Sequence, residues 1–203
     1  MEGIFYLWIL WAIWVYTTFL LNKNVAYRYS LSCFLLVLII LFPIELTIYS
    51  YKISAPLLML LTVGIYKSRT FLLKEKLYLL LSSITVGLIY SSLQLLAIYD
   101  PVWVIVDQKW MFSIISMVSV YLLFSNAHTS KKRIVTLVMG SIIGEFFAAS
   151  VLLNVGFPYT IGSYAFLDYL SVCLLGIMFM HIISGLHASI VRIPTRKGEM
   201  KNL

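Results

Sequence analysis

Three carboxylic acids lie inside long apolar stretches of this chain, where a charge is unfavourable. Glu45, Glu145 and Asp168 each fall in a different apolar segment, and the amide Gln94 falls in another. Placing a charged side chain in hydrocarbon costs about 3 kcal/mol, so such residues face the interior of a helix bundle or a water-filled cavity. Buried carboxylates can carry protons or bind cations. We therefore take these four residues as candidate transport or ion-binding groups.

Each acid also has a structural interpretation, which the sequence leaves open. Glu145 could be protonated, or hydrogen-bonded to a tyrosine, a serine or a free carbonyl group. Glu45 could be satisfied by Lys52 or Tyr49 near the membrane surface. Asp168 could stabilise the N-terminus of its own helix through the helix dipole.

His181 and Ser184 in the last apolar segment could extend a polar path towards the opposite side of the membrane. The alternative is that His181 is a hydrogen-bonded packing residue. The other histidine of this segment, His187, points about 240° away around the helix, which argues against a shared metal ion.

Signatures of enzyme chemistry are missing from the sequence. It contains no HExxH zinc motif, no GxSxG nucleophile motif, no nucleotide-binding loop and no CxxC pair. The last apolar segment has no lysine that could hold retinal as a Schiff base. An enzyme is therefore the weaker interpretation, and we predict no metal ion and no cofactor.

The elements that position these residues are predicted to be membrane-spanning helices. A chain that is 62% hydrophobic and 11% charged, with a mean hydropathy of +0.97, is not a soluble domain. A bilayer core needs about 20 apolar residues per helix. We predict an all-α polytopic membrane protein, one domain over residues 1–203 with seven transmembrane helices. The predicted helices are 3–21, 30–51, 53–66, 77–99, 102–125, 134–153 and 165–191.

The basic residues predict the orientation of this bundle. Nearly all of the 15 Lys and Arg residues fall in the first, third and fifth connections and the C-terminal tail; the exceptions are Lys52 and Lys109. Short basic loops stay on the cytoplasmic side, so the N-terminus is predicted outside and the C-terminus in the cytoplasm. The basic side suits anionic inner-leaflet lipid, and nothing predicts nucleic-acid binding.

Depth in the membrane groups the polar residues. At about 1.5 Å per residue from the outer helix ends, Asp168 lies about 5 Å deep, Gln94 about 8 Å, Glu45 about 9 Å and Glu145 about 12 Å. The sequence thus predicts an outward-facing acidic vestibule, although depth alone says nothing of lateral proximity.

Small residues predict close helix packing in the sixth apolar segment. Gly140, Gly144 and Ala148 recur every four residues and form a stripe that another helix can approach closely. We expect this stripe to pack within the bundle rather than to form a dimer.

The opening MEGIFYLWILWAIWVY, the chain length and the seven-segment plan resemble the YphA family, small membrane proteins of Bacillus and its relatives. The resemblance implies the plasma membrane of a Gram-positive bacterium. It implies no activity and no functional residues.

These observations leave two functional hypotheses. The first is a small transport or permeation protein for protons, cations or cationic solutes, acting through the vestibule. The second is a non-catalytic accessory or envelope-assembly protein that acts through an unknown membrane partner, in which case the acids are structural or pair with that partner.

Overall fold

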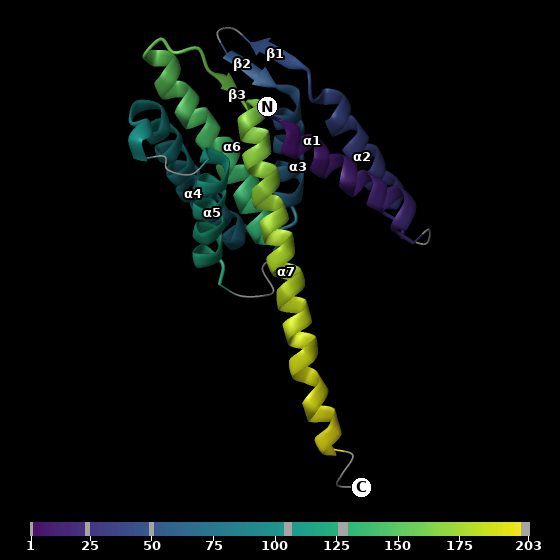
Figure 1. The fold of residues 1–203 in the computed structure, drawn as a ribbon. Helices are drawn as coiled ribbons and strands as arrows, with labels where there is room; N and C mark the ends of the chain where they lie inside the picture. Colours follow the sequence, from purple (N-terminus) through teal and green to yellow (C-terminus); the bar gives the residue numbers. More distant parts are fainter. Residues whose placement is uncertain (1, 23–24, 49–50, 104–106, 126–129, 200–203) are drawn as a thin grey trace.

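The computed structural model describes residues 2–22, 25–48, 51–103, 107–125 and 130–199, and only the backbone of 103 and 186–199. These residues form helices and a small sheet, and each predicted apolar segment contains one helix (Figure 1). The helices are α1 (Ile4–Val15), α2 (Arg28–Leu41), α3 (Ala55–Ser68), α4 (Leu73–Tyr99), α5 (Gln108–Leu123), α6 (Ser130–Asn154) and α7 (Tyr164–Glu199). The strands are β1 (Glu45–Ile48), β2 (Tyr51–Ser54) and β3 (Thr160–Ile161).

Three of the described helices, α4, α6 and α7, are long and apolar enough to cross a membrane. The other four are shorter apolar helices, of which α1 is extended by a π-helical turn over Tyr16–Leu20. In Figure 1, α4 to α7 lie together, α3 packs on α6, and α1 and α2 form a hairpin beside α7. The hairpin diverges from α7 towards its far end, and the C-terminal part of α7 extends beyond the other helices.

The closest helix pair is α4 and α6, which meet through glycines. A Cβ atom on Gly144 would lie 2.6 Å from the carbonyl oxygen of Gly87, and one on Gly140 would lie 2.9 Å from that of Ser83. Ala148, one turn further along α6, is fully buried. The predicted small-residue stripe therefore faces α4 within the bundle.

The second predicted helix, over 30–51, is wrong in its second half, because α2 ends at Leu41. Pro43 has no N–H to continue the helix and its ring clashes with the preceding turn, so the helix stops where only a kink was expected. The following Leu46-Thr47-Ile48 run favours a strand. β1 pairs antiparallel with β2, with Glu45 opposite Ser54, and β2 pairs parallel with β3. The fold is therefore mostly helical, with a small three-stranded sheet that the sequence did not predict.

The fifth predicted helix, over 102–125, begins later than expected. Pro101 starts only a short 3-10 turn that ends at Trp103, and α5 begins at Gln108 after Asp107. Residues 104–106 lie outside the described part of the chain. The shift leaves Asp107 and Lys109 at the start of α5, at the end of the molecule that carries the sheet. We call this end the sheet end.

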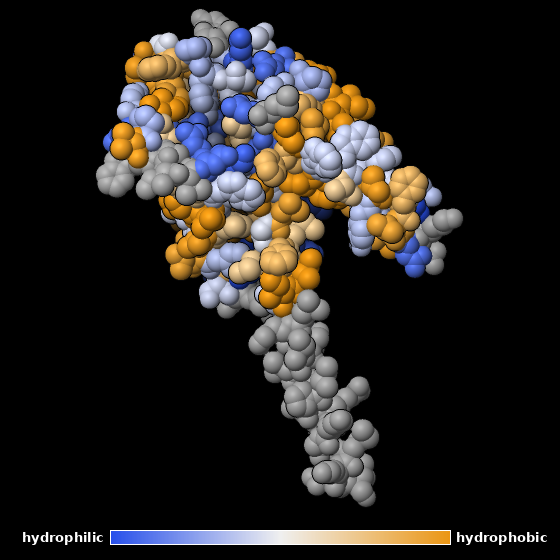
Figure 2. All heavy atoms as spheres, in the orientation of Figure 1, coloured by the Kyte–Doolittle hydropathy of each residue, from blue (hydrophilic) through white to orange (hydrophobic). Residues whose placement is uncertain are grey.

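The two ends of the bundle differ in chemistry. Hydrophilic side chains gather at the sheet end above a largely hydrophobic surface (Figure 2). At the opposite end, Lys132 on α6 forms a 2.9 Å ion pair with Glu75 on α4. The buried Arg133 donates to the carbonyl oxygen of Phe124 and stacks over Tyr121, 4.3 Å from the ring centroid.

Candidate functional site: an acidic vestibule above a buried glutamate

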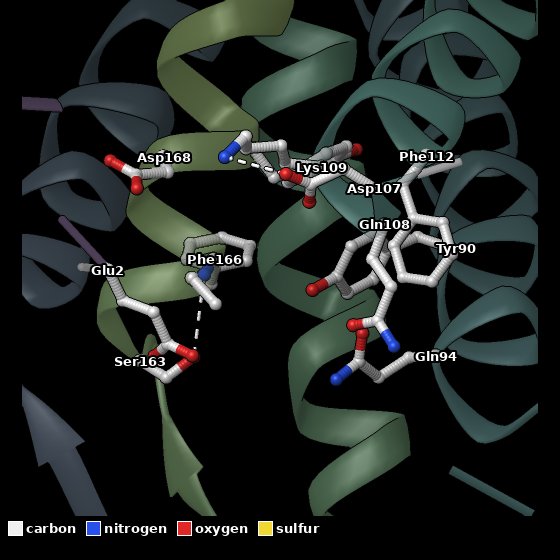
Figure 3. A pocket seen from close by; sticks show the side chains of 12 residues that line it. Glu2, Tyr90, Gln94, Asp107, Gln108, Lys109, Phe112, Ser163, Phe166 and Asp168 are labelled. Atoms are coloured by element: carbon white, nitrogen blue, oxygen red, sulfur yellow. Dashed lines mark hydrogen bonds and ion pairs between the residues drawn. The ribbon is translucent and has the colours of Figure 1, made fainter. Parts of the chain in front are cut away.

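A cavity of about 270 Å³ opens at the sheet end, between the end of α4 and the starts of α5 and α7 (Figure 3). We call it the vestibule. Its walls combine carboxylates, one ammonium group, amides and aromatic rings. The lining residues are Glu2, Tyr90, Gln94, Asp107, Gln108, Lys109, Phe112, Ser163, Ala165, Phe166, Asp168 and Tyr169.

Acids outnumber bases on the vestibule wall. Lys109 lies 2.9 Å from Asp107, and its ammonium group also lies 4.8 Å from the ring centroid of Phe5. The hydrogen bond from Lys109, helped by its charge, holds the pKa of Asp107 below its usual range. Glu2 and Asp168 form no ion pair among the described residues. The wall is therefore suited to attract a cation.

Asp168 also has a structural role, because it stabilises the start of α1. Its two carboxylate oxygens accept hydrogen bonds from the backbone N–H groups of Gly3 and Tyr6, each at 2.8 Å. The first N–H groups of a helix have no partner within the helix, and a carboxylate satisfies them and favours the helix dipole. Asp168 is only 3% exposed. It therefore serves the N-terminus of α1, whereas the structural interpretation from the sequence assigned it to its own helix.

Glu145 lies beneath the vestibule and is fully buried. Its carboxylate accepts hydrogen bonds from the hydroxyl of Tyr90 at 2.8 Å, the hydroxyl of Tyr159 at 2.9 Å and the backbone N–H of Gly162 at 3.3 Å. No ion pair involves it among the described residues. A buried carboxylate that lacks a cationic partner depends on such donors for its stability.

Gly162 can reach Glu145 because it has no side chain. Its φ is +76°, in the left-handed region, and a Cβ atom would lie 2.7 Å from the Cδ1 atom of Leu57. Gly162 directly follows β3, whose pairing with β2 fixes its position. The small sheet thus positions one of the three donors to Glu145.

Tyr90 connects the vestibule with Glu145, since it both lines the cavity and donates to the carboxylate. Gln94, one turn further along α4, lines the same cavity and interacts with the phenol of Tyr159. Burial, reinforced by the charge of Glu145, raises the pKa of Tyr159 well above its usual range. Tyr159 therefore remains a neutral donor to Glu145 at physiological pH.

A belt of hydroxyl groups lies below the vestibule, inside the bundle. The hydroxyl of Tyr169 on α7 donates to Ser116 on α5 at 2.9 Å and lies 3.0 Å from the hydroxyl of Ser141 on α6. The rings of Tyr90 and Tyr169 pack with their centroids 4.7 Å apart. These contacts close the floor of the vestibule.

Three predicted site residues do not join this cluster. Glu45 is exposed on β1 and does not line the vestibule, because α2 ends at Leu41, before Glu45. His181 and Ser184 are exposed on α7 and do not line the vestibule. His181 lies 2.9 Å from the hydroxyl of Ser130, and Ser184 donates to the carbonyl oxygen of Met180 within the helix.

Comparison with known proteins gives the chain its family. The model of the family described as YphA-like integral membrane protein matches residues 2–202. The chain belongs to this family. It is 29% identical over 185 residues to the protein named "Uncharacterized protein YphA" of Bacillus subtilis (strain 168). The aligned region covers 91% of this chain and 88% of that protein. No solved structure matches the chain.

Membership of the YphA-like family confirms the resemblance seen in the sequence and makes this chain an integral membrane protein. Glu145 then lies within a helix that is long and apolar enough to cross the membrane. Among the described residues, no group of three His, Cys, Asp or Glu side chains lies close enough to hold a metal ion. The polar groups of the site are carboxylates, tyrosines, amides, a serine and one lysine.

Several residues of this site were not singled out from the sequence. Tyr90 had a usable signal, because it precedes Gln94 by four residues and so shares its face of a helix. Tyr159 and Gly162 had none, since they reach Glu145 through an uncharged loop whose path depends on the sheet. The ion pair between Asp107 and Lys109 was not predicted either, because its geometry depends on where α5 begins.

Proposed function

We propose that this YphA-like protein binds small cations or small cationic solutes in the vestibule and passes them across the cell membrane. The observation that carries the proposal is the position of Tyr90, which links an acid-lined cavity to the fully buried Glu145 through one hydrogen bond. Burying a carboxylate without a cationic partner inside an integral membrane protein is energetically unfavourable, and for this reason such a residue is a candidate for a functional role.

The vestibule suits a small cation in both charge and surface. Glu2 and Asp168 supply carboxylates that form no ion pair with any described residue. The aromatic residues Tyr90, Phe112, Phe166 and Tyr169 also line the cavity, and aromatic rings can attract positive charge. A volume of about 270 Å³ is below the range of about 300–1,000 Å³ that drug-sized ligands occupy. An inorganic cation or a slender amine fits this space better than a bulky organic molecule.

Passage requires the floor of the vestibule to open. Separation of Tyr90 from Glu145 would expose the carboxylate to a proton or cation that has entered the cavity. The belt of Tyr169, Ser116 and Ser141 would then have to part for movement further inward. These hydroxyl groups can exchange partners with a passing ion, as residues along membrane pathways do.

The orientation that we propose has seven crossings in the plasma membrane of a Gram-positive bacterium, with the N-terminus outside and the C-terminus in the cytoplasm. The alternating basic loops support this orientation. Because Glu2 lines the vestibule, an outside N-terminus would make the vestibule open outward.

Flux into proteoliposomes tests the proposal. Purified protein would be assayed for uptake of protons, sodium, potassium and putrescine, alongside Glu145→Gln and the matched control Glu45→Gln. We expect wild-type flux of at least one of these cations, a fall of about tenfold or more in Glu145→Gln, and no change in Glu45→Gln. Absence of flux from folded wild-type protein, or equal flux in Glu145→Gln, would refute the proposal.

The exposed sheet supports a second candidate, an accessory protein that docks a partner. β1 lies at the edge of the sheet, and its Leu46 and Ile48 are 43% and 55% exposed. A free strand edge with apolar side chains can accept a strand from another protein. This candidate predicts a partner that co-purifies at a fixed ratio and is lost when Leu46→Lys places a charge on the edge.

A further inference from the structure

A second cavity of about 220 Å³ lies between the α1–α2 hairpin and α3, α6 and α7. We call it the lateral groove. It lies at the hollow between the hairpin and α7 that is visible in Figure 2. Its lining is almost entirely apolar and includes Ile13, Leu174 and Leu175; the polar side chains in it are those of Tyr6 and Ser171.

One residue of the groove lining, Tyr6, carries a hydroxyl that lacks a partner in the described part of the chain. Tyr6 is only 4% exposed, its ring stacks on Phe42, and its buried hydroxyl has no hydrogen-bond partner among the described residues. The hydroxyl of Ser171, the other polar side chain of the lining, donates to the carbonyl oxygen of Asp168. Buried hydroxyl groups nearly always have a partner, so an acceptor is missing at Tyr6, a residue of the groove lining.

We propose that the lateral groove binds one acyl chain of a membrane phospholipid, and that an ester carbonyl oxygen of this lipid accepts a hydrogen bond from the hydroxyl of Tyr6. The walls of the groove match the hydrocarbon tail, and the unpartnered hydroxyl matches the polar linkage at the head of that tail.

The position of Tyr6 along α1 agrees with this occupant. The backbone N–H of Tyr6 is bound by Asp168, which lines the vestibule at the sheet end, so Tyr6 lies near the hydrophilic end of the molecule. From Tyr6 to Ile13 the groove follows α1 away from that end for about 10 Å, at 1.5 Å per residue. A lipid with its ester near the membrane surface and its tail pointing inward has the same layout.

Water and a collapsed groove fit these observations less well. An apolar cavity of this kind stays dry and takes apolar ligands, whereas water needs two to four polar partners. Inward movement of the hairpin would fill the groove, but Asp168 fixes the start of α1 through two hydrogen bonds. The proposal does not depend on cation transport, so the two can fail separately.

The test is the amount of phospholipid that stays bound to purified protein. Protein extracted in mild detergent would be passed over a size-exclusion column and examined by native mass spectrometry. Wild-type protein is expected to retain about one phospholipid, whereas Leu174→Trp or Leu175→Trp should lose it because the indole fills the groove. Tyr6→Phe should reduce occupancy at limiting lipid about fivefold, since it removes the hydroxyl and keeps the ring.

Leu88→Trp is the matched control, because Leu88 is 51% exposed on α4 and does not line the groove. It should retain the lipid as wild-type protein does. Circular dichroism and a monodisperse elution profile would identify variants that fail to fold, and Leu175, at 40% exposure, provides a groove position that tolerates a larger side chain. Wild-type protein without lipid, or equal retention in both groove-filled variants and the control, would overturn the proposal.

Discussion

Replacing Tyr90 with phenylalanine is expected to lower the free energy of unfolding by about 2 kcal/mol, although it removes only one oxygen atom. The hydroxyl donates to the carboxylate of Glu145 at 2.8 Å, with Tyr90 2% exposed and Glu145 fully buried. The ring keeps its contacts with Tyr169 and Phe112, so no large cavity is formed. The loss therefore reports the hydrogen bond itself.

This magnitude is the one expected for an ionised Glu145. Hydrogen bonds between neutral side chains of membrane helices contribute about 0.6 kcal/mol on average. A bond to a charged group contributes about 1.5–3 kcal/mol. Removal of the Tyr90 hydroxyl leaves the buried carboxylate with two donors instead of three. In the Glu145→Gln background the acceptor is neutral, so the same substitution should lower the free energy by only about 0.6 kcal/mol. The double-mutant cycle should give a coupling of about 1 kcal/mol or more.

The assay is unfolding of purified protein by titration of SDS into mixed micelles, followed by circular dichroism. Tyr99→Phe on the same helix is the control, because Tyr99 is 55% exposed, and it should leave stability unchanged. If Tyr90→Phe behaved like Tyr99→Phe, or if the coupling with Glu145→Gln were zero, a charged Glu145 held by Tyr90 would be refuted.

Three further outcomes follow from other parts of the molecule. Gly144→Ala should destabilise the α4–α6 pair by about 1–3 kcal/mol in the same SDS titration, since its methyl group meets backbone. Gly185→Ala should not destabilise the protein, because a methyl group there has no neighbour within 4 Å among the described residues outside its own stretch of helix. Asp168→Ala should speed hydrogen exchange of the first amides of α1, because these amides lose the carboxylate that accepts their hydrogen bonds. Exchange in α4 and α6 should be unchanged. The lowered pKa of Asp107 means that its ion pair contributes stability above about pH 4 and loses that contribution as pH falls through the lowered pKa. Carbon-13 NMR titration should show this pKa returning upward in Lys109→Met.

The sequence was sufficient to predict most of the helices. Apolar segments of sufficient length produced one helix each, and α4, α6 and α7 are long enough to cross a membrane. The spacing of Gly140 and Gly144 marked the face of α6 that α4 approaches most closely. Both signals are local and periodic, so they can be read along a single chain.

The sheet and its consequence for Glu45 were beyond such reasoning. An apolar run after Pro43 fits a buried helix or a strand equally well. In the structure it pairs with β2, and β2 pairs in turn with β3, more than 100 residues away in the sequence. The predicted helix over 30–51 placed Glu45 in the vestibule, whereas in the structure Glu45 is exposed on β1. The estimated depths correctly grouped Gln94 and Asp168, which line one cavity. Depth in the membrane does not tell which residues contact each other at the same level, so it could not predict the hydrogen bonds of Glu145 with Tyr90 and Tyr159.

The most direct test of a cation pathway through the vestibule is to block the vestibule during flux. Gln108 lines it at the start of α5, and Gln108→Cys would be made in a Cys33→Ser background because Cys33 is a free, exposed thiol. Labelling from outside with a membrane-impermeant thiol reagent that carries a quaternary ammonium group is predicted to reduce cation flux about tenfold or more. The same labelling at Glu45→Cys, outside the vestibule, should leave flux unchanged. Complete labelling of Gln108→Cys with undiminished flux would contradict a pathway through the vestibule.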